Sequence, residues 1–268
     1  MYPQQHRLIT AEALRRLRDD GSAKVVLTEP QQIAILDGSA DEDAPSWQRL
    51  RNWHFFHSND EMPAAGRWLR FDSRYRVEEL AQSLAQSQAS EGYDLIGRLL
   101  HHIQDMSTPS HVTPVYHGGI PSDPYESWLK QQFSEWPLTA VQLAPDWIAT
   151  PSQDIGHFYQ SCAEATLKFL GDEQNALAAT HNGSSVRLPL SEFWPHYQRE
   201  DGSWLPGFAR FGRFGRQFGQ TTLQSADEEY QVAVASYREL ANTLLEKACQ
   251  ESIQALRLLL EQRVATAL

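Results

Sequence analysis

Apolar residues recur three or four positions apart through most of the chain, which is the spacing of amphipathic helices. The pattern predicts helices over residues 10–18, the second half of 24–37, 76–90, 95–106, 126–136 and 153–171, and one or two long helices over 224–266. Thr10 is predicted to cap the first of these helices. No two segments show the alternation of paired strands, so we predict a single all-α domain over residues 1–268.

The helix predicted over residues 95–106 carries the most distinctive polar side chains. His101 and Asp105 lie four positions apart, which places them on one helix face with Cβ atoms about 5–6 Å apart. Pro109 cannot continue the helix and disfavours helical geometry at Thr108. The chain is therefore predicted to turn, which brings His111 back towards the first pair.

A second helix start follows at Ser122-Asp123-Pro124, with Asp123 predicted as N-cap and Pro124 as the first helical residue. Glu126 then falls in the first turn of that helix. A mixed set of imidazoles and carboxylates suits zinc, at roughly 2.0–2.2 Å per bond. The H-x3-D-x5-H array followed by this acid predicts a metal site, while the neighbouring His102, which adjoins apolar residues, is interpreted as a core residue.

These residues carry a family resemblance. LLHHIQDMSTPSH followed by DPYESW resembles the zinc-dependent phospholipase C / S1–P1 nuclease superfamily, most closely its phospholipase C-like bacterial branch. The resemblance implies a multi-helix domain, up to three zinc ions and phosphodiester hydrolysis. It covers most of the chain, but its specific motifs lie within residues 6–126. It departs at Ser122, where the phospholipases usually have a histidine, and His117 or Asp123 is a candidate substitute.

The resemblance implies that one zinc ion is bound by His54, His101 and Asp105. His54 lies in WHFF and matches an aromatic-flanked histidine of the family, with His57 as the alternative ligand. The aromatic neighbours are interpreted as core residues that fix the rotamer of the ligand.

The resemblance also implies two further ions. One is bound by His111, Glu126 and a third ligand, for which His117 is a candidate. The other is bound by the terminal amine, here that of Met1, by His6 and by Asp105 as a bridge. The family terminus is usually Trp, and the Met1-to-His6 spacing is closer to the nuclease branch.

A carboxylate that binds or orients the nucleophilic water is expected in the segment GSADEDAPSW, which is predicted to be an acidic turn. By resemblance it follows a pair made of Gly and a small residue. Asp43 fits best by its offset from Gly38, Asp41 is the competitor, and Glu42 is a weaker candidate. We therefore predict Asp43 as the catalytic residue and as a metal-site residue.

Composition narrows the classes of function. The formal charge of −11 over 268 residues argues against stable nucleic-acid binding, which needs Lys and Arg to neutralise phosphates. It does not exclude a nuclease, because a zinc cluster supplies local positive charge. No run of about 18 apolar residues predicts a membrane span. Cys162 and Cys249 are compatible with one disulfide or with two thiols.

The first ten residues lack the apolar region of a signal peptide. The protein is therefore expected to stay inside the cell, to leave by a route without a cleaved signal, or to be shown in processed form. The family suggests secretion or a periplasmic location, and the sequence does not choose among these.

Residues 172–222 are predicted to be an irregular, aromatic-rich insertion. The stretch FARFGRFGRQFG is interpreted first as a loop whose rings pack on the core. A mobile lid and a lipid-facing patch are the alternatives, and the patch would be made of Phe208, Phe211, Phe214 and Phe218 beside Arg210, Arg213 and Arg216. His157, His181 and His196 show no ligand spacing and are interpreted as structural.

The expected function is zinc-dependent phosphodiester hydrolysis, by a phospholipase C acting on phospholipid head groups, with transient contact with a membrane surface. The DPYE helix and the acidic composition favour this over an S1/P1-type single-strand nuclease. A helical metal-binding or interaction module without catalysis stays open because of the departure at Ser122.

Overall fold

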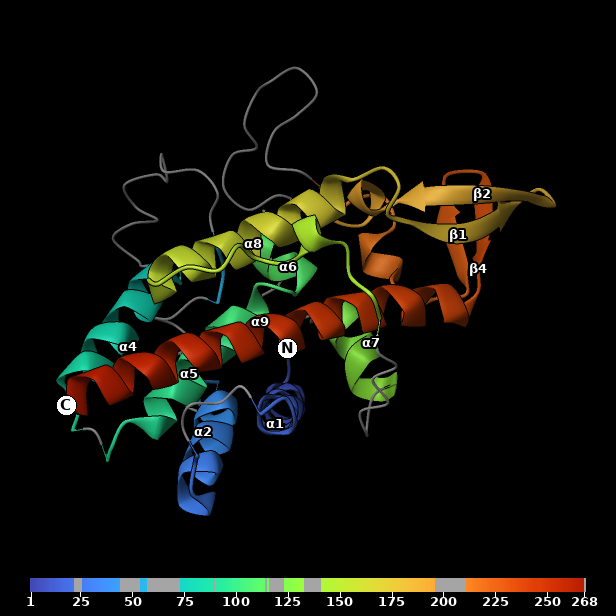
Figure 1. The fold of residues 1–268 in the computed structure, drawn as a ribbon. Coiled ribbons are helices and arrows are strands. Elements are labelled where there is room, and N and C mark those ends of the chain that lie inside the picture. Colours follow the sequence, from blue (N-terminus) through green and yellow to red (C-terminus); the bar gives the residue numbers. More distant parts are fainter. Residues whose placement is uncertain are drawn as a thin grey trace.

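The computed structural model describes residues 1–21, 26–43, 54–56, 73–88, 90–113, 115, 123–132, 141–195 and 211–267. Over these residues the protein is mostly helical and carries one small antiparallel sheet. Figure 1 shows the longest helix, α9 (Val234–Ala267), running through the molecule, with α8 (Ile155–Gly171) on one side and α1 (Pro3–Asp19) and α2 (Glu29–Asp41) on the other. α5 (Tyr93–Asp105) packs against both α2 and α9 and so lies centrally.

Shorter elements complete the helical part. α4 (Arg74–Gln86) packs on α5 and α8, and α6 (Pro109–Val112) packs on α8. α7 is Pro124–Gln132, and single turns of 3-10 helix are formed by η1 (Pro145–Trp147), η2 (Leu190–Glu192) and η3 (Gly215–Gln217). The helices predicted for residues 76–90, 95–106 and 153–171 are confirmed as α4, α5 and α8.

α2 and α5 approach each other closely because glycines face each other at their contact. A Cβ atom at Gly97 would lie 2.1 Å from the carbonyl oxygen of Ile35, and one at Gly38 would lie 2.1 Å from that of Asp94. Any larger residue at either position would push the two helices apart. The close approach brings the carbonyl of Ser39 against α5, where it lies within hydrogen-bond distance of His101.

Two helix boundaries differ from the prediction. α1 begins at Pro3, and the side chain of Gln5 accepts a hydrogen bond from the backbone N–H of Tyr2. Thr10 therefore lies inside the helix, fully buried, and is not its cap. α2 runs to Asp41, so the first part of the predicted acidic turn is helical because it packs on α5.

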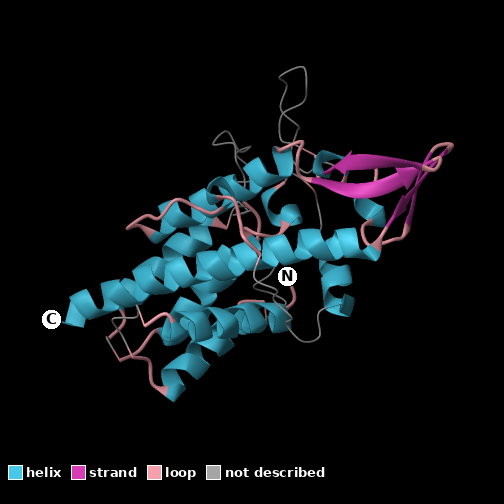
Figure 2. Ribbon diagram, turned by 45° about the vertical axis from the view of Figure 1, so that its right-hand side comes forward, coloured by secondary structure: helices cyan, strands magenta, loops and turns pink. Residues whose placement is uncertain are grey.

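The prediction of a mostly helical fold is confirmed, but the prediction that no strands pair is wrong. Four strands form a sheet in the order β2-β1-β4-β3, with β1 at Ala176–His181, β2 at Ser184–Pro189, β3 at Thr222–Ser225 and β4 at Glu228–Val232. Figure 2 shows this sheet at one end of the molecule. The strands are four to six residues long, too short for strong alternation. The predicted helical start at 224 is strand, and the helix begins at Val234.

A turn signal for the first hairpin was nevertheless present in the sequence. Asn182 and Gly183 both have positive φ, of 49° and 76°, which is the geometry of the two-residue turn that Asn-Gly favours between paired strands. Residues 172–222 are therefore partly a regular hairpin, and the prediction of an irregular insertion is wrong for that part.

The aromatic stretch packs inward where the structure describes it. Phe214 is fully buried and Phe218 is 5% exposed, and the ring of Phe218 contacts Trp128 on α7 and Tyr237 on α9. The packed-loop interpretation is confirmed for these two residues, which cannot belong to an exposed patch. Phe208, Arg210 and His196 lie outside the described residues.

Two further sequence questions are answered within the described part of the chain. Cys162 and Cys249 are both buried free thiols, so they do not pair with each other. None of the described helices combines the length and the apolar character that a membrane span requires.

Candidate metal centre

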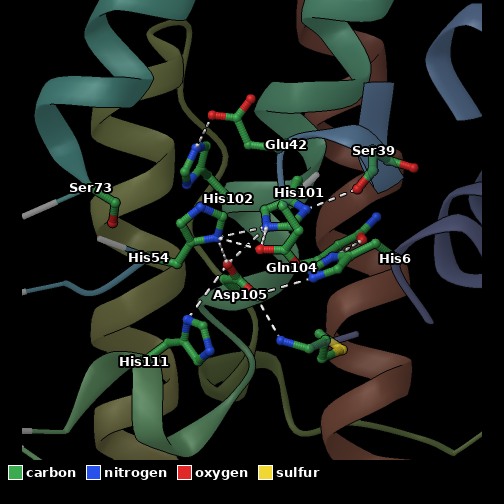
Figure 3. A network of polar contacts seen from close by, with 12 residues as sticks. His6, Ser39, Glu42, His54, Ser73, His101, His102, Gln104, Asp105 and His111 are labelled. Carbon is green, nitrogen blue, oxygen red and sulfur yellow. Dashed lines mark hydrogen bonds and ion pairs between the residues drawn. The ribbon is translucent and has the colours of Figure 1, made fainter. Parts of the chain in front are cut away.

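Asp105, the last residue of α5, lies at the centre of a buried polar cluster (Figure 3). Its Oδ2 atom lies 2.9 Å from Nδ1 of His54, 3.3 Å from Nε2 of His101 and 3.5 Å from Nδ1 of His111. α5 ends here as predicted, Pro109 opens α6, and this turn returns His111 to the pair. The structure therefore brings together the three residues of the H-x3-D-x5-H array, and His54 joins them.

The other carboxylate oxygen of Asp105 faces the N-terminal segment. Oδ1 lies 3.2 Å from the amino nitrogen of Met1 and 3.3 Å from Nε2 of His6. The amino nitrogen also lies 3.0 Å from Oε1 of Glu126 on α7. The terminal amine and His6, which the resemblance assigns to one ion together with Asp105, are thus both within contact distance of the same oxygen.

α7 supplies the remaining acid. Oε1 of Glu126 lies 2.8 Å from Nε2 of His111, and the backbone N–H of Glu126 donates to Oδ1 of Asp123 at 2.9 Å. Asp123 is therefore the N-cap that the sequence predicts, and that oxygen serves the helix. His117 and Ser122 lie outside the described residues, so the third ligand beside His111 and Glu126 stays a prediction.

The three candidates for the water-binding carboxylate separate clearly. Oδ1 of Asp43 lies 3.7 Å from Nδ1 of His54 and 3.9 Å from Nε2 of His101. Asp41 is exposed on the outside of α2. Glu42 is buried and takes part in a different contact, described next. Asp43 alone of the three lies within 4 Å of both His54 and His101. His57, the alternative to His54, lies outside the described residues.

Glu42 forms a buried ion-pair network beside the centre. Its oxygens lie 2.6 Å from Nε of Arg76 and 2.8 Å from Nη1 of Arg98, and Oε1 lies 3.4 Å from Nε2 of His102. Burial acts to raise the pKa of Glu42, but His102 and Arg76 lower it well below its ordinary value. The carboxylate is therefore ionised and already neutralised.

His102 has a closer relation to the site than its apolar neighbours suggested. It is fully buried, as predicted, but its ring centroid lies 4.8 Å from that of His54. His102 thus links the network of Glu42 to a candidate ligand. The positions of Ser39 and Gln104 around the cluster escaped sequence analysis, and Glu42, named there as a weaker catalytic candidate, lies instead in the ion-pair network. Gln104 could have been found from the sequence, because it is a polar residue on the apolar side of a strongly amphipathic helix.

The hydrogen bonding of His101 fixes which ring nitrogen faces the cluster. Nδ1 lies 2.9 Å from the carbonyl oxygen of Ser39, and a carbonyl can only accept, so Nδ1 carries a proton. Nε2 then faces Nδ1 of His54 at 2.7 Å and Oδ2 of Asp105 at 3.3 Å, and in the neutral ring it presents a lone pair to them. Two acceptors facing each other in a buried place repel unless a cation, a proton or a metal, lies between them.

The pKa values agree with a cluster that attracts cations. Burial raises the pKa of Asp105, but His111, the terminal amine and His101 hold it well below its ordinary value. Burial lowers the pKa of His101, but Asp105 and Asp43 raise it to about 9. The acids that raise the pKa of His101 would also attract a metal ion, which binds the deprotonated ring.

Several combinations of these side chains fit a metal ion. In the described part of the chain, the groups whose ligand atoms lie within 4.8 Å of one another are His54–His101–Asp105, His6–Asp43–His101 and Glu42–His54–His102. The third group is the poorest, because a cation there would face the guanidinium groups that hold Glu42. The imidazole and carboxylate donors of the other two suit zinc.

Three side chains of the cluster keep some exposed surface. The side chains of His54, Asp43 and Glu126 are 10%, 15% and 17% exposed, whereas Asp105 has no exposed surface. Asp43 and Glu126 are therefore more open to solvent than Asp105.

The chain matches no protein-family model, and neither the curated proteins nor the solved structures contain a significant match. The family resemblance of the motifs therefore stays a prediction, and the function has to be argued from the geometry of the site.

Proposed function

We propose that the protein is a zinc-dependent phosphodiester hydrolase, most closely of the phospholipase C type, acting on phospholipid head groups. One observation carries the proposal: both carboxylate oxygens of Asp105 are buried among metal-ligating groups from distant parts of the chain. These groups are the amine of Met1, His6, His54, His101 and His111.

Zinc ions bound at such a site supply positive charge for the phosphoryl oxygens and lower the pKa of a water molecule. The protein's residues divide the remaining work by their exposure. Asp105, which is fully buried, would hold two ions by its two oxygens. Asp43, which is partly exposed beside His54 and His101, would orient the attacking water and accept its proton.

The net charge separates the substrate classes within phosphodiesters. A nucleic-acid strand carries a row of phosphates, and the formal charge of −11 disfavours binding it along a surface. A phospholipid offers one phosphodiester at a time. A single-strand nuclease is the alternative, because the short Met1-to-His6 spacing is closer to that of the nuclease branch. In the structure the amine of Met1 and the ring of His6 both lie next to Oδ1 of Asp105.

The test compares two substrates with one protein preparation. The protein is incubated with phosphatidylcholine vesicles and with single-stranded DNA, before chelation, after chelation and after zinc is returned. Head-group release that chelation stops and zinc restores is the expected result. Cleavage of DNA without hydrolysis of the phospholipid would show that the protein is a nuclease and not a phospholipase. Zinc binding without hydrolysis of either substrate would favour a non-catalytic module, and absence of zinc binding would contradict the proposal.

A further inference from the structure

Gln104 lies beside Asp105 on α5, and its side chain is fully buried between α1 and α9. Its amide nitrogen donates to Oγ1 of Thr10 at 2.9 Å and to Oγ of Ser252 at 3.1 Å. Figure 3 shows the other end of this amide next to His6. The side chain therefore connects two helices to one candidate ligand.

The orientation of the amide follows from the hydroxyl of Ser252. This hydroxyl donates its own proton to the carbonyl oxygen of Ala248, at 2.7 Å. Its oxygen is then left to accept, so the group of Gln104 that faces it must be the NH2 donor. Oε1 of Gln104 consequently faces Nδ1 of His6, at 2.8 Å.

This contact sets the tautomer of His6. An amide oxygen can only accept, so Nδ1 of His6 carries the proton and Nε2 keeps its lone pair. Nε2 lies 3.3 Å from Oδ1 of Asp105 and makes no hydrogen bond with any residue that the structure describes.

We propose that Gln104 is a positioning residue, which holds His6 with Nε2 aimed at a divalent cation shared with Oδ1 of Asp105. The inference rests on the proposed zinc-dependent function and assigns one residue that makes one ion site possible. Outer partners of metal-bound imidazoles fix the ring and its tautomer, and their loss costs about 10–100-fold in metal affinity.

The first variant is Gln104→Met, which keeps the volume and removes the acceptor. We expect it to hold one zinc ion fewer per chain after dialysis against a chelator of moderate affinity, while the remaining ions stay bound. Zinc content by elemental analysis and thermal unfolding of the metal-free protein are measured together. Gln250→Met, which removes a glutamine bonded to Glu246 on α9, is the matched control and should keep every ion.

The second variant is Gln104→Glu, which restores an acceptor oxygen opposite His6 and should restore the missing ion. If Gln104→Met does not fold, Gln104→Glu decides alone: retention of the full zinc content supports the role, and loss of the ion overturns it. If Gln104 only stabilised the fold, Gln104→Met would weaken the binding of every ion and not of one ion alone.

The third measurement is a double-mutant cycle with His6→Ala. Gln104→Met should weaken zinc binding at this site by about 10–100-fold, and should have no further effect once His6 is absent. If the wild type binds zinc and Gln104→Met binds the same number with the same affinity, this inference falls while the proposed function stands. Loss of all ions together with a less stable metal-free protein would also overturn it. A wild type without zinc would refute both.

Discussion

Among single residues, the tautomers of His101 and His6 determine which ring nitrogens face Asp105. Neutral oxygens, the carbonyl of Ser39 and the amide of Gln104, hold the protons of His101 and His6 on Nδ1. The Nε2 atoms of both rings then point at opposite oxygens of Asp105. Such an arrangement of acceptors needs a donor or a cation among them, and the described donors are Nδ1 of His54 and the amine of Met1. The candidate ligands were predictable from the sequence, but these outer partners were not, because they depend on how α1, α2 and α5 pack.

Asp105 is the residue whose loss should be most damaging. Asp105→Asn should release the ions that its two oxygens hold and lower hydrolysis by more than about 1,000-fold, since the chemistry depends on bound zinc. The measurements are zinc content and the rate on a soluble phosphodiester. Asp94→Asn, an exposed change on the same helix, should alter neither. Full zinc content and full activity in Asp105→Asn would refute the scheme.

Asp43 should separate catalysis from metal binding. Asp43→Asn should lower kcat by about 100- to 10,000-fold, the usual range for a lost general base, while most of the zinc stays bound by the histidines and Asp105. The neighbouring Asp41→Asn, on the exposed side of α2, is the control and should keep wild-type kcat. Equal activity of the Asp43 and Asp41 variants would remove Asp43 from the mechanism.

At the scale of elements, the glycine contact between α2 and α5 places the backbone of Ser39 against His101. The sequence predicted both helices, but periodicity cannot show that glycines on two helices face each other. It also missed that α2 continues to Asp41, because packing on α5 rather than local propensity extends it. The site therefore depends on a contact that only the assembled fold reveals.

Gly97→Ala should disturb this contact. The added Cβ would lie 2.1 Å from the carbonyl oxygen of Ile35, so the helices must separate, at a cost of about 1–3 kcal/mol for overpacking. The free energy of unfolding, measured with urea, and the zinc affinity should both fall. Gly156→Ala, where the nearest atom is a flexible carboxylate oxygen of Asp154 at 3.2 Å, should leave both close to wild type. Unchanged zinc affinity in Gly97→Ala would show that the contact does not set the site.

Glu42 should stabilise the fold rather than catalyse. Glu42→Gln leaves Arg76 and Arg98 without their buried partner, which should cost about 3 kcal/mol at neutral pH. Because the pKa of Glu42 is held far below its ordinary value, this contribution is present above about pH 4.5 and is lost as the pH falls towards the lowered pKa.

The measurement for this prediction is urea unfolding of wild type and Glu42→Gln at pH 7 and at about pH 3. The difference in free energy of unfolding between the two proteins should be smaller at the lower pH. Glu79→Gln removes the exposed partner of Arg76 and should cost less than about 1 kcal/mol. A constant gap at both pH values would mean that the charge of Glu42 is not what stabilises the fold.

At the scale of the whole molecule, the helical part followed from periodicity and the sheet did not. Strands of four to six residues give too few alternations to separate from loop sequence, although Asn182-Gly183 marked one hairpin. The aromatic stretch that follows is part of the support of the site. Phe218 packs on Trp128 of α7, and α7 carries Glu126 into the cluster. A distant segment thereby fixes a candidate ligand.

The central claim is that both oxygens of Asp105 hold divalent cations in company with the surrounding histidines. Anomalous diffraction at the zinc edge, from crystals grown with zinc, tests it most directly. We expect separate zinc peaks about 2.0–2.2 Å from Oδ1 and from Oδ2 of Asp105, one of them also bonded to Nε2 of His6. Crystals grown with zinc that show no peak beside Asp105, with its oxygens bonded to protonated imidazoles instead, would refute zinc binding at this residue.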